Sequence, residues 1–278
     1  MKVTKTIKLF INGEFPRTES GRSYPIYHSR SKKEYARLCQ ASRKDLRNTV
    51  SFAKAAQKKW SQRTAYNRGQ ILYRIAEMME GKRDEIATVL NMTQGLSAVQ
   101  SKTIINSSID HFVHFAGMSD KYEQILGSKN PVNGPFHNFS SPSPVGVVSY
   151  LTSNEESLDS LCEKIAATVV TGNSLIILLG SKTEALLSTL GEILKTSDLP
   201  NGVVNLLTGR IEELVAHFFS HMEINATNYS NLKKDYLTQG KIEGASHLKR
   251  INNLNGLNSI SLLEKAIDYK TYWHPIGQ

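Results

Sequence analysis

The pattern of hydrophobic and polar residues predicts a helical first half of the chain. Leu46, Val50, Ala53 and Trp60 recur at helical spacing and predict one amphipathic helix of about four turns. Ser42 lies four residues before Leu46, the first residue of this run. Asp45 lies three residues after Ser42, as in a capping box. Three further amphipathic helices are predicted at 67–80, at 83–93 and from Ser97 onward.

From residue 145 the pattern alternates between strands and helices. Strands are predicted at 145–151, 174–179, 203–207 and 222–228, and helices at 157–170, 183–194 and 211–219. The run from Ser174 to Leu179 is almost wholly apolar, which is typical of a strand buried on both faces of a parallel sheet. Short connections between alternating elements favour right-handed crossovers, so we expect a doubly wound α/β sheet.

Two other segments carry turn signals. Asn12-Gly13 separates Lys8–Ile11 from Glu14-Phe15 and predicts a tight β-hairpin, and 23–27 predicts another short strand. Residues 127–144 contain six glycines and prolines, which exclude a helix there. This stretch is either a linker or an edge hairpin.

Composition narrows the class of protein. The chain has 278 residues, 40% of them hydrophobic, so we expect a packed core rather than disorder. We find neither an apolar run long enough for a membrane-spanning helix nor a secretion signal. Cys39 and Cys162 are too few for a disulfide framework, so we expect a reducing, cytoplasmic location. The net charge of +9 is scattered along the chain, and we therefore do not expect a nucleic-acid partner.

Several motifs, taken in order, resemble those of the aldehyde dehydrogenase superfamily. They are Leu9–Phe15, Asn67–Leu72, Pro144–Val148, Gly172-Asn173 and Leu199–Asn205. The resemblance implies an α/β fold with a doubly wound, Rossmann-like nucleotide-binding domain. It also implies a helical N-terminal portion and a β-hairpin oligomerisation element.

A finer resemblance is to the degenerate C-terminal half of the two-domain sixteenth aldehyde dehydrogenase family. It rests on Ala116–Tyr122 and on the ending Tyr269–Gly277, among other segments. It implies that the catalytic domain is absent. The expected organisation is an N-terminal hairpin and helical portion, an oligomerisation hairpin, a Rossmann-like portion and a C-terminal oligomerisation strand, at residues 1–126, 127–144, 145–262 and 263–278.

The resemblance also indicates what chemistry the chain retains. Neither Cys39 nor Cys162 matches the family's nucleophilic thiol, and both are expected to be small core residues. Asn253 replaces the general-base glutamate, and an amide cannot take up a proton near neutral pH. Asn154 matches the asparagine that holds the oxyanion, although a loop or N-cap role before the following helix explains it as well. We therefore predict no catalytic residue.

The nucleotide site implied by the resemblance is eroded. Leu178 stands where the family has a ribose-binding lysine, and Ser181 stands where it has an acidic residue. Ser230 and Asn231 lie in the turn that in the family meets the pyrophosphate through a glycine. We expect a degenerate crevice near these four residues, no tightly bound cofactor, and room at most for weak NAD or NADP binding.

Other polar clusters are assigned ordinary roles. His217 and His221 are four residues apart on one predicted helix, but we predict no metal site there. Glu155, Glu156 and Asp159 open a predicted helix, where carboxylates favour the positive end of the helix dipole.

These observations predict an inactive aldehyde dehydrogenase-like protein, a pseudoenzyme with a structural or regulatory role. Its expected partners are further copies of itself or a catalytic aldehyde dehydrogenase subunit, with no membrane partner. Two alternatives stay open: a component that binds NAD and completes an oxidoreductase site in trans, and a basic protein that binds polyanions.

Overall fold

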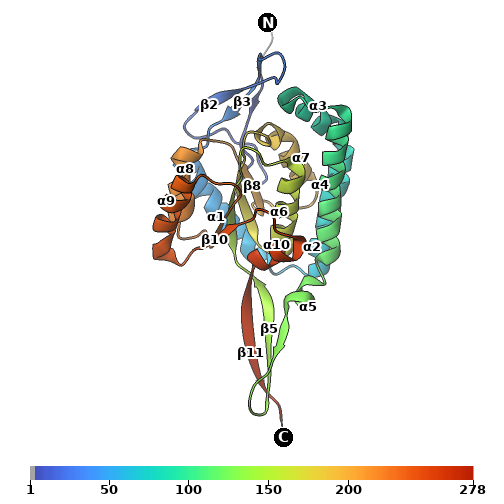
Figure 1. Ribbon diagram of the computed structural model, residues 1–278, viewed down its shortest axis with the longest axis vertical. Coiled ribbons are helices and arrows are strands. Elements are labelled where there is room, and N and C mark those ends of the chain that lie inside the picture. Colours follow the sequence, from blue (N-terminus) through green and yellow to red (C-terminus); the bar gives the residue numbers. More distant parts are fainter. Residues whose placement is uncertain (1–3, 278) are drawn as a thin grey trace.

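The computed structural model describes residues 4–277, and a five-stranded parallel sheet lies at its centre (Figure 1). The strand order is β10-β9-β6-β7-β8. The bounds are β6 Val147–Leu151, β7 Ser174–Leu178, β8 Val204–Leu207, β9 Ala226–Tyr229 and β10 Arg250–Asn253. Because the first strand, β6, lies between β7 and β9, the chain winds outward in two directions. The predicted doubly wound sheet is confirmed.

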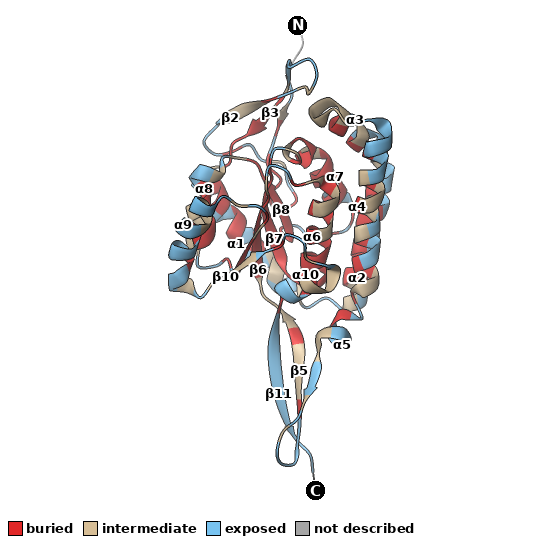
Figure 2. Cartoon of the chain, viewed as in Figure 1, coloured by how far each residue is buried: buried red, intermediate tan, exposed pale blue. Residues whose placement is uncertain are grey.

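Helices cover both faces of this sheet. Helices α6 (Leu158–Val170) and α7 (Leu187–Thr196) lie on one face, while α1 (Arg43–Trp60), α8 (Ile211–Ser220) and α9 (Lys234–Gly244) lie on the other (Figure 1). Successive residues of β7 enter opposite cores, which explains why its sequence is continuously apolar. The strands accordingly form the buried centre of the molecule (Figure 2).

A layer of N-terminal helices packs over α6. It contains α2 (Ala65–Gly81), α3 (Arg83–Gln94), α4 (Ala98–Met118) and the short α5 (Tyr122–Leu126). Trp60 at the end of α1 donates a 2.9 Å hydrogen bond from Nε1 to the carbonyl of Val169. Buried Arg68 in α2 donates one of 2.8 Å to the carbonyl of Val170. These bonds cap the end of α6 and tie α1 and α2 to the central domain.

The N-terminal segment forms a small sheet and extends the central one. The small sheet contains β1 (Thr6–Ile7), β2 (Ser23–Tyr27) and β3 (Glu34–Cys39), in the order β1-β3-β2. The Asn12-Gly13 turn is confirmed, with positive φ at both residues. Asn12 donates its N–H to Oδ1 of Asn205 at 2.9 Å, and a Cβ at Gly13 would meet Oδ1 of Asn201 at 2.0 Å. The motifs Leu9–Phe15 and Leu199–Asn205 therefore contact each other in the folded chain.

Residues 128–144 form the edge hairpin that was one of the two sequence alternatives. Strands β4 (Ser128–Asn130), β5 (Phe136–Pro144) and β11 (Ile267–Pro275) make an antiparallel sheet of order β11-β5-β4, called the paddle below. The paddle projects away from the body of the molecule (Figure 1). The short helix α10 (Ser259–Lys265) leads directly into β11, and it connects the last strand of the parallel sheet to the paddle.

Buried Asn173 fixes the base of the paddle. Its Oδ1 accepts the N–H of Gly146 at 2.8 Å, and its Nδ2 donates to the carbonyl of Ala266 at 2.6 Å. The Gly172-Asn173 motif thus joins the start of β6 to the end of α10. Among residues 4–277, no helix has the length and apolar character needed to cross a membrane.

Candidate functional site: a crevice at the switch point

A crevice of about 400 Å³ opens at the carboxyl ends of β6, β7 and β9. Its lining comes from the segment after each of these strands, from the start of α8 and from β2 of the small sheet. Since β6 is the strand at which the winding reverses, this is the position where doubly wound sheets bind ligands. Asn154, Leu178, Ser230 and Asn231, four of the positions singled out from the sequence, all line it.

The loops after β6 and β7 are locked together at one wall of the crevice. Ser181 donates its N–H to Oδ1 of Asn154 at 3.3 Å and its hydroxyl to the Asn154 carbonyl at 3.1 Å. A Cβ at Gly180 would lie 2.1 Å from the Ser153 carbonyl, so the two backbones touch at a glycine. The N-cap of α6 is Ser157, so Asn154 is a loop residue rather than the cap. Its side chain and carbonyl bind Ser181 in the loop after β7.

The turn after β9 presents side chains to the crevice. Ser230 is buried, and its hydroxyl lies 2.5 Å from the hydroxyl of Tyr150. Asn231 has a φ of +47°, and its Oδ1 accepts a 2.5 Å hydrogen bond from Asn255. Leu232 and Lys233 complete the lining up to the start of α9. A phosphate therefore meets side chains here rather than open backbone N–H groups.

Glu184 and Tyr24 form a contact in the crevice that the sequence did not reveal. The Tyr24 hydroxyl donates to Oε2 of Glu184 at 2.7 Å. Burial raises the pKa of Glu184 to about 7, although the Tyr24 hydrogen bond lowers it. Burial, followed by the Glu184 charge, raises the pKa of Tyr24 well above its usual range. A carboxyl with a pKa near 7 in a cleft can either hold or release a proton at neutral pH.

The other charged groups of the crevice are of both signs. Lys182 pairs with Glu155 at 2.7 Å, and the Tyr236 hydroxyl donates to Glu212 at 2.9 Å. Arg210 also lines the crevice, and its charge opposes the rise in the pKa of Tyr24. The charged residues of the lining are of both signs, namely Glu155, Glu184, Glu212, Arg210 and Lys233.

A buried ion pair lies next to Glu155 of the crevice lining and adds a contact that the sequence did not predict. Nζ of Lys164 lies 2.5 Å from Oε1 of Glu156, and the two side chains are only 7% and 4% exposed. Ser160 bonds to both groups, and the ammonium lies 5.6 Å from the centre of the Tyr150 ring. Glu156 directly precedes Ser157, the N-cap of α6, and is also the buried partner of Lys164. An apolar helix face hid this pair in the sequence.

The remaining predicted residues lie outside the crevice. Both cysteines are buried, and burial raises the pKa of Cys162 to about 12, so its thiolate is strongly disfavoured. Asn253 is exposed on β10, where its Oδ1 accepts the N–H of Asn255 at 3.1 Å. His217 and His221 lie on and just after α8, on the outer side of the molecule. In the described part of the chain, no three metal-ligating side chains converge on a point.

Comparisons with known proteins identify the fold family. A sequence model of the aldehyde dehydrogenase family matches residues 15–230. The chain belongs to this family. Retinal dehydrogenase 2 of Homo sapiens is 27% identical over 271 residues, which are 95% of this chain and 52% of that protein. Mitochondrial 10-formyltetrahydrofolate dehydrogenase of Mus musculus is 28% identical over an alignment of 280 positions. The alignment covers 96% of this chain and 30% of that protein.

Solved structures agree with this assignment. The NAD⁺ complex of an aldehyde dehydrogenase from Bacillus cereus matches with a TM-score of 0.80 and 25% identity, over 90% of this chain and 50% of that one. A 3,6-anhydro-L-galactose dehydrogenase in complex with NAP shares the fold, with a TM-score of 0.80 and 20% identity. This aldehyde dehydrogenase family chain thus spans about half the length of the relatives it matches, and that half has the nucleotide-binding fold.

Proposed function

We propose that this chain is a non-catalytic subunit that associates through its paddle with an active aldehyde dehydrogenase or with further copies of itself. Its role would be structural or regulatory, in the reducing cytoplasm where two unpaired cysteines persist. The paddle is the observation that carries this proposal.

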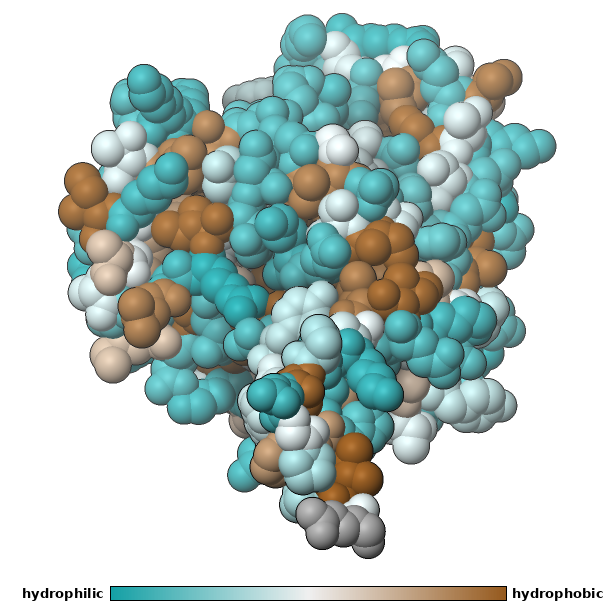
Figure 3. Space-filling view, turned by 60° about the horizontal axis from the view of Figure 1, so that its bottom comes forward, coloured by the Kyte–Doolittle hydropathy of each residue, from teal (hydrophilic) through white to brown (hydrophobic). Residues whose placement is uncertain are grey.

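The paddle has two properties of an association surface. Within the described residues, β11 has a neighbour on one side only, so its outer edge offers N–H and C=O groups to a further strand. The paddle also exposes large aromatic side chains. They include Trp273, which is 61% exposed, together with Phe136, Tyr269 and Tyr272. Figure 3, in which the lower end of the molecule is turned toward the viewer, shows hydrophobic and hydrophilic surface mixed there. Exposed aromatic groups beside an open strand edge favour contact with another protein.

The chemistry of the described residues favours a non-catalytic role. A family enzyme needs a reactive thiolate, and the two thiols here are buried away from the crevice. The position matched to the general base holds Asn253, whose amide is not a base. The turn where the resemblance places a pyrophosphate site is filled by Asn231 and its neighbours.

Sedimentation of the purified chain tests the proposal. We expect an oligomer, or a complex when a full-length aldehyde dehydrogenase from the same cells is added. Trp273→Glu places a charge on the paddle and should shift the chain toward monomer. The matched control is Tyr66→Glu, which changes a 71% exposed tyrosine on α2, outside the paddle. A wild-type chain that stays monomeric and takes up no partner would contradict the proposal, as would equal effects of both variants.

The first alternative is a component that binds NAD and completes an oxidoreductase site in trans. The family fold and the retained crevice support it. Calorimetric titration of the purified chain with NAD and NADP, followed by an aldehyde oxidation assay with and without a catalytic partner subunit, separates it from the scaffold role. Saturable binding together with reduction of the cofactor would favour the alternative.

The second alternative is a basic protein that binds polyanions, which the net charge of +9 supports. Retention on duplex DNA that falls steeply with salt concentration would favour it.

A further inference from the structure

A second groove, remote from the crevice, lies between α1 and the end of α8. It has a volume of about 400 Å³, within the usual range for small-molecule sites. Arg43 and Arg47, one helical turn apart on α1, form one wall together with Lys44. His217 and His221 form the facing wall, and buried Leu46 contributes an apolar floor. Basic side chains thus face one another across an accessible hollow.

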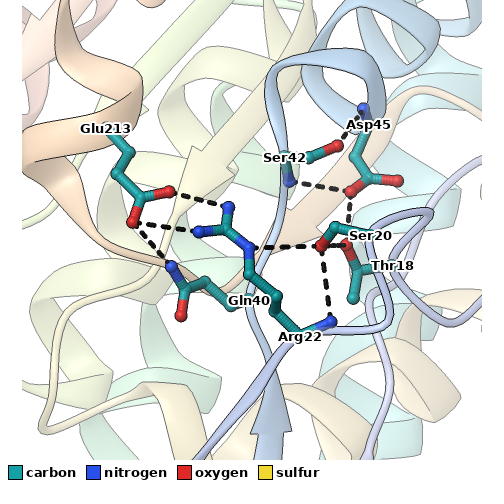
Figure 4. Close-up of polar contacts among 7 residues, drawn as sticks. All are labelled: Thr18, Ser20, Arg22, Gln40, Ser42, Asp45 and Glu213. Carbon is teal, nitrogen blue, oxygen red and sulfur yellow. Dashed lines mark hydrogen bonds and ion pairs between the residues drawn. The ribbon is translucent and has the colours of Figure 1, made fainter.

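Four carboxylates beside this groove already have partners. Arg22 holds Glu213 through two contacts of 3.3 and 2.8 Å, and Gln40 adds a third of 2.8 Å (Figure 4). Asp45 accepts the hydroxyl of Thr18 at 2.7 Å and the N–H of Ser42 at 2.8 Å (Figure 4). These acidic groups are held by their own donors.

Glu19 and Glu223 are engaged in the same way, whereas Glu243, which faces His217, forms no ion pair with another described residue. Glu19 pairs with Lys44 at 2.7 Å, and Glu223 pairs with Lys54. Among residues 4–277, by contrast, neither Arg43 nor Arg47 forms an ion pair. Two guanidinium groups therefore face the groove without an anion.

The carbonyl groups at the carboxyl end of α8, which would otherwise repel an anion, are partly neutralised by a lysine. Lys249 donates from Nζ to the carbonyls of His221 and Ile224 at 2.7 and 2.5 Å, which neutralises the exposed carbonyls at this helix terminus. The Ser220 side chain lines the groove between the two histidines and adds a hydroxyl donor. None of the residues that line the groove carries a carboxylate, and five of the seven have a basic side chain.

We infer that this groove binds a small phosphate-bearing anion. Arginine presents a planar fork of donors that matches phosphate oxygens, and two such forks stand one turn apart on the same helix. The two histidines would add charge to the groove as the pH falls. The groups that face them are Arg43 and Glu243 at His217, and Lys249 and Glu223 at His221. Nothing in the crevice or the paddle is needed for this activity.

Burial, and then the neighbouring cations, hold the pKa of both histidines below its usual range. A bound phosphate offsets those cations and raises the two pKa values. By linkage, anion binding should therefore strengthen as the pH falls toward the pKa values of the two histidines, which lie below 6.5 in the free chain.

Calorimetry with inorganic pyrophosphate as the probe tests the inference on the full chain. We expect one binding event per chain, weakened at least about tenfold by the double variant Arg43→Ala/Arg47→Ala. The matched control, Lys58→Ala/Lys59→Ala, removes two exposed cations from the other end of the same helix and should leave affinity unchanged. Because all four side chains are exposed, both double variants should fold, and thermal unfolding checks this.

Histidine NMR signals provide a site-specific readout. Pyrophosphate should shift the ring signals of His217 and His221 and leave those of His28, in the loop after β2, in place. The inference is overturned by absence of binding at millimolar pyrophosphate or by equal losses in the two double variants. It is also overturned if duplex DNA binds more tightly than pyrophosphate, since that result indicates a general polyanion surface.

Discussion

The pKa of Glu184 gives a stability test of the crevice. This carboxyl has a pKa of about 7 in the folded chain, against an ordinary value of 4.5, because the protein buries it beside Tyr24. The folded state therefore keeps a proton that the unfolded state releases between these two pH values. The contribution of Glu184 is at its most favourable below pH 4.5, declines as the pH rises to about 7, and is constant above that.

The size of the effect follows from the separation of the two pKa values. At about 1.4 kcal/mol per pH unit, the separation between 4.5 and about 7 gives an upper bound of about 3–4 kcal/mol for the cost at pH 8. Glu184 borders an open crevice, and water reduces the penalty on its ionised form, so we expect between about 1 and 3 kcal/mol.

Glu184→Gln isolates this effect, because glutamine retains an acceptor for Tyr24 but does not ionise. Urea unfolding of both proteins, followed by tryptophan fluorescence, gives the free energy of unfolding at about pH 5 and about pH 8. The wild type should lose stability relative to the variant over this interval. Tyr24→Phe should shift the decline to higher pH, since the lost hydrogen bond lowers the Glu184 pKa. A difference between wild type and Glu184→Gln that does not change with pH would refute the reasoning.

Three further predictions concern the buried interior. Lys164→Met leaves the Glu156 charge buried without its partner and should lower the free energy of unfolding by about 3–5 kcal/mol. The double variant Glu156→Gln/Lys164→Met should lower it by less than the sum of the two single changes, as a double-mutant cycle measured by urea unfolding would show. Cys39 and Cys162 should react with a thiol reagent only when guanidinium unfolds the chain, and fast labelling of the native protein would disprove their burial. Trp60→Phe removes the donor to the Val169 carbonyl and should lower the unfolding free energy by about 1–3 kcal/mol, as judged from the urea midpoint.

The sequence predicted the elements whose burial follows a regular period. Ser42 and Ser97 are the N-cap residues of α1 and α4. Both have the reciprocal hydrogen bonds of a capping box. The parallel strands were recognisable because β6 and β7 are buried at every position.

Elements without such a period were missed. The buried residues of α9 are Gly240 and Gly244, which give no apolar stripe, and α9, β10 and α10 were not predicted. Strand β3 was hidden by charged residues, although Ala36 and Leu38 alternate inward along it. In these segments tertiary packing decides the structure rather than local pattern.

The sequence predicted one part of the candidate site and missed another. Asn154, Leu178, Ser230 and Asn231 were located through the resemblance, and the crevice brings them together. The Tyr24–Glu184 contact joins residues 160 positions apart, and neither residue belongs to a motif. Only the docking of the small N-terminal sheet beside the central domain makes their proximity apparent.

The pairing of β11 with β5 has a consequence for synthesis on the ribosome. Its nine register pairs link residues 267–275 to residues 136–144, so β5 stays half-paired until more than a hundred further residues have been translated. In that interval the nascent chain carries an open strand beside an already foldable parallel core, and another nascent copy could occupy it. Translation speed and chaperone access while residues 145–275 are synthesised would then determine how much of the product closes correctly.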